Sequence, residues 1–330
     1  MSATADGTGE SPQPSEARSA LEILAGAATA ALLFSAFLVL PLGLIGLPFA
    51  AVPVVRLAHR RGAAVGLLAA SLAATVILLL GWAAGGAGEA IDVAILAAVL
   101  IALPALLAAT IRRGLDPSRA FLALCAAGIV VGGAAILLRW PGADAAMARQ
   151  IDQGVDQWLR ISTQATKTPL DPETAARLRA TLEAARGFCK RFWVGLIGAS
   201  WCFGAAVAFF TGAWSARPAP SADATRFDAL RIPAPIAALF VASGAGWALE
   251  KGAVGRVAGN VLWALLALYF VAGLSIICDF ARRWFRSKLL RIGLYALAIY
   301  VVPINVGVAV LGLFDWYADF RRRGREIRKS

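Results

Sequence analysis

Two long apolar runs near the C-terminal end of the chain, both within residues 255–323, constrain its fold more than any other feature. Each run has about 24 residues without a charge in its middle, and at a helical rise of about 1.5 Å per residue it can cross a hydrocarbon layer of about 30 Å. Both runs are therefore predicted to be membrane-spanning helices. They contain Asn260 and Asn305. Because a side-chain amide facing lipid lacks hydrogen-bond partners, we expect each to point at another helix or a water-lined cavity.

The composition extends this prediction to the rest of the chain. Hydrophobic residues make up 59% of its 330 residues, and apolar stretches recur along almost its whole length. A soluble domain of this composition has too little polar surface to cover its core, so we expect an integral membrane protein. The predicted fold class is all-α: a polytopic transmembrane helix bundle of about eight or nine spans with an amphipathic helical hairpin insertion.

Changes in composition predict how the chain is divided. Residues 1–20 are small, polar and rich in Pro and Ser, which indicates a disordered N-terminal tail. The other predicted regions are an N-terminal membrane bundle at 21–140, an extramembrane amphipathic helical hairpin at 141–190, a C-terminal membrane bundle at 191–320 and a basic C-terminal tail at 321–330.

Prolines divide the first apolar block of the chain. Pro41, Pro48 and Pro53 interrupt it, so we predict a full span near residues 23–40 and a short tilted or re-entrant helix near residues 44–57. At the other end of the chain, residues 292–314 are predicted to form the last span.

A change in periodicity identifies the hairpin. Its second helix is predicted to begin after Asp171, whose carboxylate is a favoured N-cap and is followed by a proline. Its first helix has apolar residues at helical spacing among charged ones: Met147, Ile151, Val155 and Trp158. We interpret the hairpin as a solvated insertion packed on the membrane face. The alternative is a docking surface for a partner.

The basic residues predict which side of the membrane each loop faces. If the loops alternate sides, most lysines and arginines fall on one face, among them Arg60, Arg61 and the cluster at 282–291. This face is expected to be cytoplasmic. The tail at 321–330 contradicts the charge rule if the last run crosses fully, and the sequence leaves this conflict open. The bias toward Ala, Gly and Arg favours a bacterial origin, so the expected location is the bacterial cytoplasmic (inner) membrane.

The sequence carries none of the common catalytic motifs. It has no GxxxxGK[ST], GxSxG or HExxH pattern, and its single histidine, His59, is expected at headgroup level in a basic segment. The four cysteines include no CxxC pair and are interpreted as buried small hydrophobic residues. We therefore expect no enzyme, no catalytic residue, no bound metal and no cofactor.

The net charge of +12 does not indicate nucleic-acid binding. The arginines stand in short runs at the ends of apolar segments and form no basic stripe interleaved with aromatic residues. The expected partner is the lipid bilayer, and no nucleic-acid partner is expected.

Small residues recur four positions apart in several runs. In the first span Gly26 pairs with Ala30, and Ala27 pairs with Ala31. Such spacing lets helix backbones approach closely. These four residues are predicted to serve helix packing within the chain or the docking of a partner.

The last two runs also contain the candidate ligand-binding residues. The direction of the two helices predicts that both asparagines lie in the outer half of the membrane. A cavity between the helices would be apolar and aromatic with a few hydrogen-bonding groups. Its predicted residues are Asn260, Tyr269, Ser275, Tyr300 and Asn305. The alternative is that the two amides only form hydrogen bonds across the helix interface.

Several segments together resemble the YybS-like predicted membrane proteins (domain of unknown function 2232). They are LPFAAVPVVRLAHRRGAAVGLLAA near the start, FDALRIPAPIAAL, GNVLWALLALYFVAGLSIICDF and the closing LGLFDWYADFRRR. The N-terminal half, with its proline-broken second helix followed by Arg-Arg-Gly, is also similar to the S components of energy-coupling factor transporters. That similarity implies binding of a small solute and a separate energising ATPase and transmembrane subunit.

Two function hypotheses follow. The first is a solute-binding, S-component-like transport subunit, and the second is a membrane scaffold or assembly factor without a ligand. The second hypothesis requires another membrane protein as partner.

Overall fold

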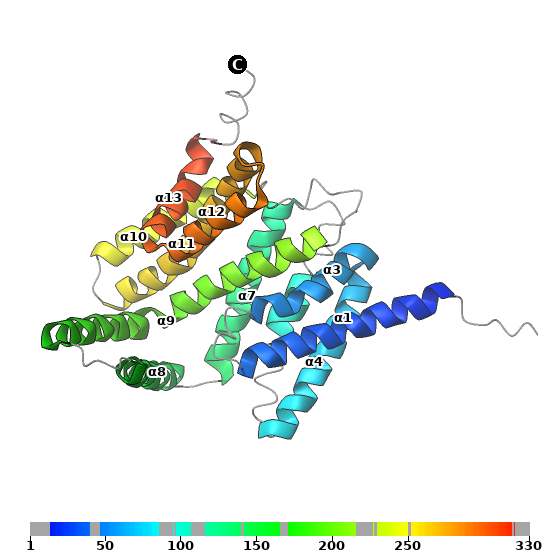
Figure 1. Cartoon of the computed structure of the whole chain (residues 1–330), viewed down its shortest axis with the longest axis horizontal. Coiled ribbons are helices and arrows are strands. Elements are labelled where there is room, and N and C mark those ends of the chain that lie inside the picture. Colours follow the sequence, from blue (N-terminus) through cyan, green and yellow to red (C-terminus); the bar gives the residue numbers. More distant parts are fainter. Residues whose placement is uncertain are drawn as a thin grey trace, which may run out of the picture. The chain divides into compact units, whose positions relative to one another are not determined.

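The computed structural model of the chain shows only helices among the residues that it describes (Figure 1). The described residues are 14–39, 47–85, 95, 97–106, 116–139, 142–165, 171–215, 227, 230–249, 252–318 and 320. The all-α prediction is confirmed for this part of the chain. Two compact units share these helices: Met1–Leu124 with Val207–Thr225, and Cys125–Ala206 with Arg226–Ser330.

The first unit is built from helices near the start of the chain. They are α1 (Pro14–Val39), the 3-10 helix η1 (Leu47–Ala51), α3 (Val52–Arg61), α4 (Ala63–Gly85), the π-helix η2 (Ala98–Ala102) and the beginning of α7 (Pro117–Arg139). The short helix predicted near residues 44–57 corresponds to η1 and α3.

The first helix begins earlier than predicted. The disordered tail was expected to reach residue 20, but α1 starts at Pro14. The Arg61 guanidinium on α3 donates to Ser19 Oγ and Glu22 Oε2, each at 3.1 Å. These contacts tie the polar first turns of α1 to the rest of the unit, which explains why the helix extends beyond the apolar sequence.

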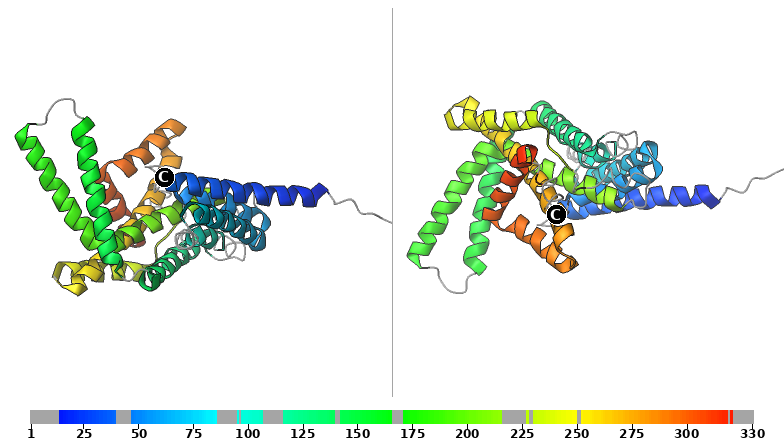
Figure 2. Two further views of the ribbon diagram at one scale, coloured as in Figure 1. Left: turned by 90° about the horizontal axis from the view of Figure 1, so that it is seen from below. Right: turned by 90° about the horizontal axis from the view of Figure 1, so that it is seen from above.

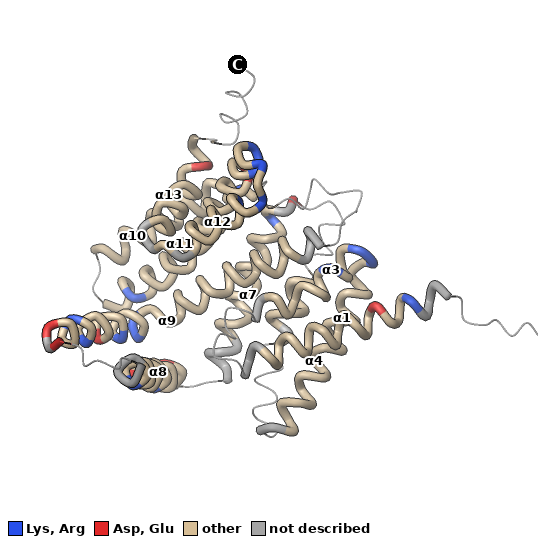
Figure 3. Tube along the Cα trace, in the orientation of Figure 1, with Lys and Arg blue, Asp and Glu red and all other residues tan. Residues whose placement is uncertain are grey.

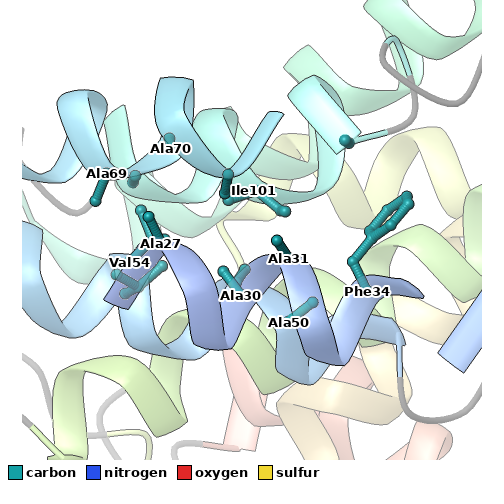
Figure 4. Close-up of a cluster of buried hydrophobic side chains, with 14 of the residues drawn as sticks. Ala27, Ala30, Ala31, Phe34, Ala50, Val54, Ala69, Ala70 and Ile101 are labelled. Atoms are coloured by element: carbon teal, nitrogen blue, oxygen red, sulfur yellow. The ribbon is translucent and has the colours of Figure 1, made fainter. Parts of the chain in front are cut away.

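Small side chains form the core of the first unit. The buried residues of α1 include Ala30 and Phe34, both fully inaccessible to solvent. Figure 4 shows how they lie against alanine and branched residues of the neighbouring helices, among them Ala50, Val54, Ala69, Ala70 and Ile101. Because alanine keeps the helices close, this core needs few large side chains.

A glycine makes the sharp connection between α3 and α4. Gly62 has φ 108°, a conformation that side chains disfavour, and its N–H donates to the Ala58 carbonyl at 3.1 Å. A Cβ at Gly66 would lie 2.5 Å from the Ala58 Cβ, so α3 and α4 touch closely beyond the turn. His59 is buried on α3, where its ring packs against Phe209 with centroids 6.2 Å apart. Its location at headgroup level stays a prediction.

The second unit is organised around α11 (Ala253–Trp284). It also contains the end of α7 from Cys125, α8 (Ala143–Ala165), the part of α9 (Pro172–Ser215) up to Ala206, α10 (Ala234–Leu249), α12 (Lys288–Tyr300) and α13 (Val302–Ala318). Helices α10, α12 and α13 all pack on α11 (Figure 1). The first of the two apolar runs within residues 255–323 thus forms the central helix of this unit.

The α8 helix runs antiparallel to the first half of α9. The Arg186 guanidinium lies 2.6 Å from Asp156 Oδ1, Lys190 Nζ lies 2.7 Å from Asp152 Oδ1, and Trp193 Nε1 donates to Asp144 Oδ1 at 2.7 Å. Charged residues gather on this pair and at helix ends, while the apolar stretches between them carry few (Figure 3). The location of α8 and the first half of α9 outside the bilayer stays a prediction.

Fewer helices than predicted meet the requirements of a membrane span. Among the described residues, four are long and apolar enough: Arg18–Ala36, Ala63–Ala83, Glu173–Thr211 and Ala253–Trp284. A fifth is added if the bent pair Lys288–Ile299 and Ile304–Ala318 forms one broken span. The count of eight or nine is therefore not confirmed. The apolar helices Ser118–Ala134 and Ala234–Leu249 are shorter. The sequence also predicts a span near residues 92–111, and part of this stretch lies outside the described residues.

Candidate functional site

The α9 helix, which packs against α11, is not continuous. Phe192 has φ −119° and ψ 18°, which breaks the helix between its charged first half and its apolar second half. The predicted boundary between the hairpin at 141–190 and the C-terminal membrane bundle at 191–320 lies next to this break. In an unbroken helix the Gly195 N–H would donate to the Arg191 carbonyl four residues earlier.

The Asn260 side chain on α11 bridges these two main-chain groups. Its Oδ1 accepts from the Gly195 N–H at 2.6 Å, and its Nδ2 donates to the Arg191 carbonyl at 3.4 Å. The same Nδ2 donates to the Arg256 carbonyl on its own helix at 2.8 Å. An amide inserted into the hydrogen-bond ladder of a neighbouring helix is a known cause of a kink. Asn260 therefore points at another helix, as the sequence predicted, and its polar atoms are satisfied there.

Close backbone contact accompanies this bridge. A Cβ at Gly195 would lie 2.5 Å from the Asn260 carbonyl oxygen and 2.7 Å from its Cα. Only glycine at this position lets α11 approach near enough for the Asn260 amide to reach the α9 backbone.

Asn305 serves a similar break between α12 and α13. Val301 is extended between the two helices, with φ −96° and ψ 103°. The Ile299 carbonyl would normally accept from the N–H of residue 303, but that residue is a proline and has none. The Asn305 Nδ2 donates to this carbonyl at 3.1 Å and so replaces the missing donor.

The Asn305 Oδ1 and the Tyr269 hydroxyl differ from the Asn260 amide. Both oxygens are buried and form no hydrogen bond with the described residues. Tyr269, on α11, is only 2% exposed, and its ring packs edge-on against Phe240 with centroids 5.4 Å apart. Buried polar atoms without partners are uncommon in folded proteins, so these two are the best candidates for contact with a bound molecule.

The other predicted ligand-binding residues give no further support. Ser275 is fully buried, and its hydroxyl donates to the Ala272 carbonyl at 2.7 Å, with the Leu230 carbonyl 3.4 Å away. Tyr300 ends α12, and its side chain lies outside the described residues.

The packing of α13 on α11 fixes where the two asparagines lie. A Cβ at Gly273 would clash with the Val308 carbonyl, and one at Gly312 with the Tyr269 carbonyl, so the helices run antiparallel in backbone contact. This register places Asn305 level with residue 276 of α11. Asn260 is then about 24 Å away along the helix axis at about 1.5 Å per residue. The two amides were expected in the same half of the membrane, but the structure does not bring them together.

Sequence reasoning missed an ion pair on α11. Asp279 and Arg283 are both largely buried, and the Arg283 guanidinium contacts both carboxylate oxygens, with Nε 3.1 Å from Oδ1. The i, i+4 spacing at the end of an apolar run is the sequence signal that could have indicated it. The pair marks where the apolar middle of α11 ends and its charged C-terminal end begins.

The predicted packing residues of α1 face the interior of the first unit. Ala27, Ala30 and Ala31 are buried, and a Cβ at Gly26 would clash with the Leu57 side chain. Their surroundings favour helix packing within the chain over partner docking. In the described part of the chain, no three His, Cys, Asp or Glu side chains gather as metal ligands would.

Comparison with known proteins agrees with the membrane assignment. A family model described as a predicted membrane protein (DUF2232) matches residues 27–316. Neither the curated proteins nor the solved structures gave a match.

Proposed function

The chain belongs to the DUF2232 family of predicted membrane proteins, and from this premise we propose that it is a membrane scaffold or assembly factor that works without a ligand. In this proposal it resides in a bacterial cytoplasmic membrane, catalyses no reaction and holds another membrane protein as partner. The polar pair formed by α8 and the first half of α9 would lie outside the bilayer, within reach of that partner.

The observation that carries this proposal is the set of hydrogen bonds made by Asn260. All of the bonds to its amide come from protein main chain, at Gly195, Arg191 and Arg256. An amide used in this way has little capacity left for a solute. The most conspicuous polar residue of the apolar stretch is thus explained by helix architecture.

A specific observation favours a second function, a solute-binding subunit energised by a separate ATPase. The Tyr269 hydroxyl and Asn305 Oδ1 are buried without hydrogen bonds to described residues. A small solute with hydrogen-bonding groups could satisfy either of them. The two atoms lie on different helices. Because Asn305 is level with residue 276 of α11, it lies about 10 Å from Tyr269 along the axis of that helix. Each atom would therefore contact a different part of a solute.

Extraction of the full chain from bacterial membranes into lipid nanodiscs tests the two functions. We expect the wild-type chain to retain a second membrane polypeptide in fixed stoichiometry and no stoichiometric small molecule, as measured by native mass spectrometry. Tyr269→Phe removes only the hydroxyl and keeps the ring against Phe240, so it should leave this composition unchanged.

The same sample gives the opposite answer if the second function is correct. A small molecule bound at one per chain in the wild type and lost in Tyr269→Phe would overturn the scaffold proposal. Phe240→Leu serves as a matched control, because it changes packing at the same place without removing a polar group.

A further inference from the structure

The α12 helix exposes a face without any charge. Leu289, Leu290 and Ile292 are 80%, 59% and 62% exposed. The opposite face is covered: Ala298 is buried, and the Tyr295 hydroxyl contacts Cys278 Sγ on α11 at 3.4 Å. A continuous apolar surface of this kind needs an apolar environment.

The direction of α12 differs from that of its neighbours. The axes of the two pieces Lys288–Ile299 and Ile304–Ala318 are bent by 96°, and α12 and α13 form an open V (Figure 2). Since α13 lies along the spanning helix α11, α12 runs across the direction of the span. A helix perpendicular to a membrane span lies in the plane of the membrane.

The depth of α12 follows from the same register. Counting equal numbers of residues along the antiparallel helices from the contact of Gly273 with Val308 places the start of α13 level with Asp279. Asp279 belongs to the ion pair at which charges begin on α11. The end of α12 therefore lies at the boundary between the apolar and the charged part of α11.

The residues before α12 have the composition of an interfacial segment. Trp284 and Phe285 are exposed aromatic residues, and Arg286 and Lys288 are exposed bases beside them. Basic residues gather at this turn between α11 and α12 (Figure 3). Aromatic rings at the headgroup level, bases toward anionic lipid and leucines in the acyl region characterise helices that lie on a membrane.

We propose that α12 lies in the membrane–water interface and that it binds anionic phospholipid, with Arg286 and Lys288 at the headgroups and the Leu289, Leu290 and Ile292 side chains among the acyl chains. A protein partner explains the apolar face less well, because it does not account for the exposed bases and aromatic residues that border this face on one side.

Fluorescence quenching by lipid-borne nitroxides tests the orientation of α12. In the full chain, alanine replaces the four cysteines Cys125, Cys189, Cys202 and Cys278. A single new cysteine, from Leu289→Cys, Ile292→Cys or Ala296→Cys, then carries the fluorescent probe. Each labelled chain is reconstituted in phosphatidylcholine vesicles with or without phosphatidylglycerol. Nitroxides at the headgroup and deep in the acyl chain report the depth of each probe. We expect the same shallow depth for all three positions.

The same probe tests the lipid preference. At low salt, headgroup-labelled phosphatidylglycerol should quench the probe at position 289 more strongly than labelled phosphatidylcholine. The double change Arg286→Gln with Lys288→Gln should lower the relative association of phosphatidylglycerol about fivefold for each charge removed, which corresponds to about 1 kcal/mol per basic residue near the surface. Arg256→Gln, at the other end of α11, is the matched control and should leave this preference unchanged.

Three results would overturn the proposal. A depth that increases by about 10 Å from position 289 to position 296 would show that α12 spans the membrane. Protection of all three probes from both lipids would show that protein covers the face. Equal quenching by the two lipids in the wild type would refute the binding of anionic headgroups.

Discussion

The Asn260 amide bridges the Arg191 carbonyl and the Gly195 N–H, the two main-chain groups that the break at Phe192 separates. We expect Asn260→Leu to lower the free energy of unfolding by about 1–3 kcal/mol, because the partly buried Gly195 N–H loses its acceptor. Unfolding of the purified chain in bicelles measures this loss. Asn305→Leu, which removes one hydrogen bond, should cost about 0.6 kcal/mol. Equal small losses in both variants would contradict the bridging role.

Two glycines at the contact of α11 with α13 allow a second residue-level prediction. A Cβ at Gly273 or Gly312 would meet carbonyl oxygens of the other helix, which cannot rotate away as a side chain can. Gly273→Ala and Gly312→Ala should each lower the free energy of unfolding by about 1–3 kcal/mol, the usual cost of overpacking. The same unfolding measurement provides the test.

Matched controls for these variants lie on the neighbouring helices. A Cβ at Gly293 on α12 or at Gly307 on α13 would have no neighbour within 4 Å. Gly293→Ala and Gly307→Ala should therefore be neutral or slightly stabilising, since alanine favours a helix more than glycine does. If all four substitutions had the same effect, the close contact of α11 and α13 would be refuted.

At the scale of elements, the start of α9 makes a prediction about pH. The Asp171 carboxylate caps the helix by accepting from Thr174, whose N–H lies 2.9 Å from Oδ1, and this hydrogen bonding lowers the pKa of Asp171 below its ordinary value of 3.8. Because the folded pKa is the lower one, the cap stabilises the helix above pH 3.8 and is lost as the pH falls through the folded pKa.

Hydrogen–deuterium exchange of the first turn of α9 measures this cap. Asp171→Ala should speed exchange of the Thr174 amide at neutral pH. Asp171→Asn retains an acceptor oxygen, so it should resemble the wild type at neutral pH and differ from it only below pH 3.8. Exchange that is the same in the wild type and in Asp171→Ala would show that the cap contributes nothing.

The elements also show what the sequence could and could not predict. The Asp171 cap and the change from a charged to an apolar segment after residue 190 were predicted, because charge and capping residues act locally. The contact of Asn260 with another helix was predicted, but its partner was not, because Gly195 lies 65 residues away in the chain. Pro303 and Asn305 were visible within the predicted last span, but a proline either kinks or divides a helix according to its tertiary contacts. Here α13 packs on α11, and the predicted last span is divided into α12 and α13.

At the scale of the whole molecule, composition was enough to predict a helical membrane protein. The described residues form helices, and the chain matches a family of predicted membrane proteins. The number of spans was not predictable, because apolar length alone does not distinguish a straight span from a bent one. The α9 helix illustrates the difficulty: its 44 residues join a charged half to an apolar half. A run of alanine and glycine is equally compatible with a lipid-facing helix and with a buried one, and Ala27, Ala30 and Ala31 of α1 are buried.

The side on which the C-terminal tail lies sets two physical effects against each other. The tail has six basic residues between Arg321 and Lys329, which favours the cytoplasmic side, where the cluster around Arg286 is also expected. The geometry favours the opposite side, because α13 runs antiparallel to the spanning helix α11 and its 17 residues extend about 25 Å, close to the thickness of the hydrocarbon layer. The packing of α13 against α11 fixes the direction of α13, whereas tail charges beyond the last span influence orientation less consistently.

We therefore expect a reporter fused after Ser330 and one inserted at Ser287 to be accessible from opposite sides of the membrane. Accessibility of both from the same side would show that α13 does not cross the bilayer, and that the charge of the tail decides the topology.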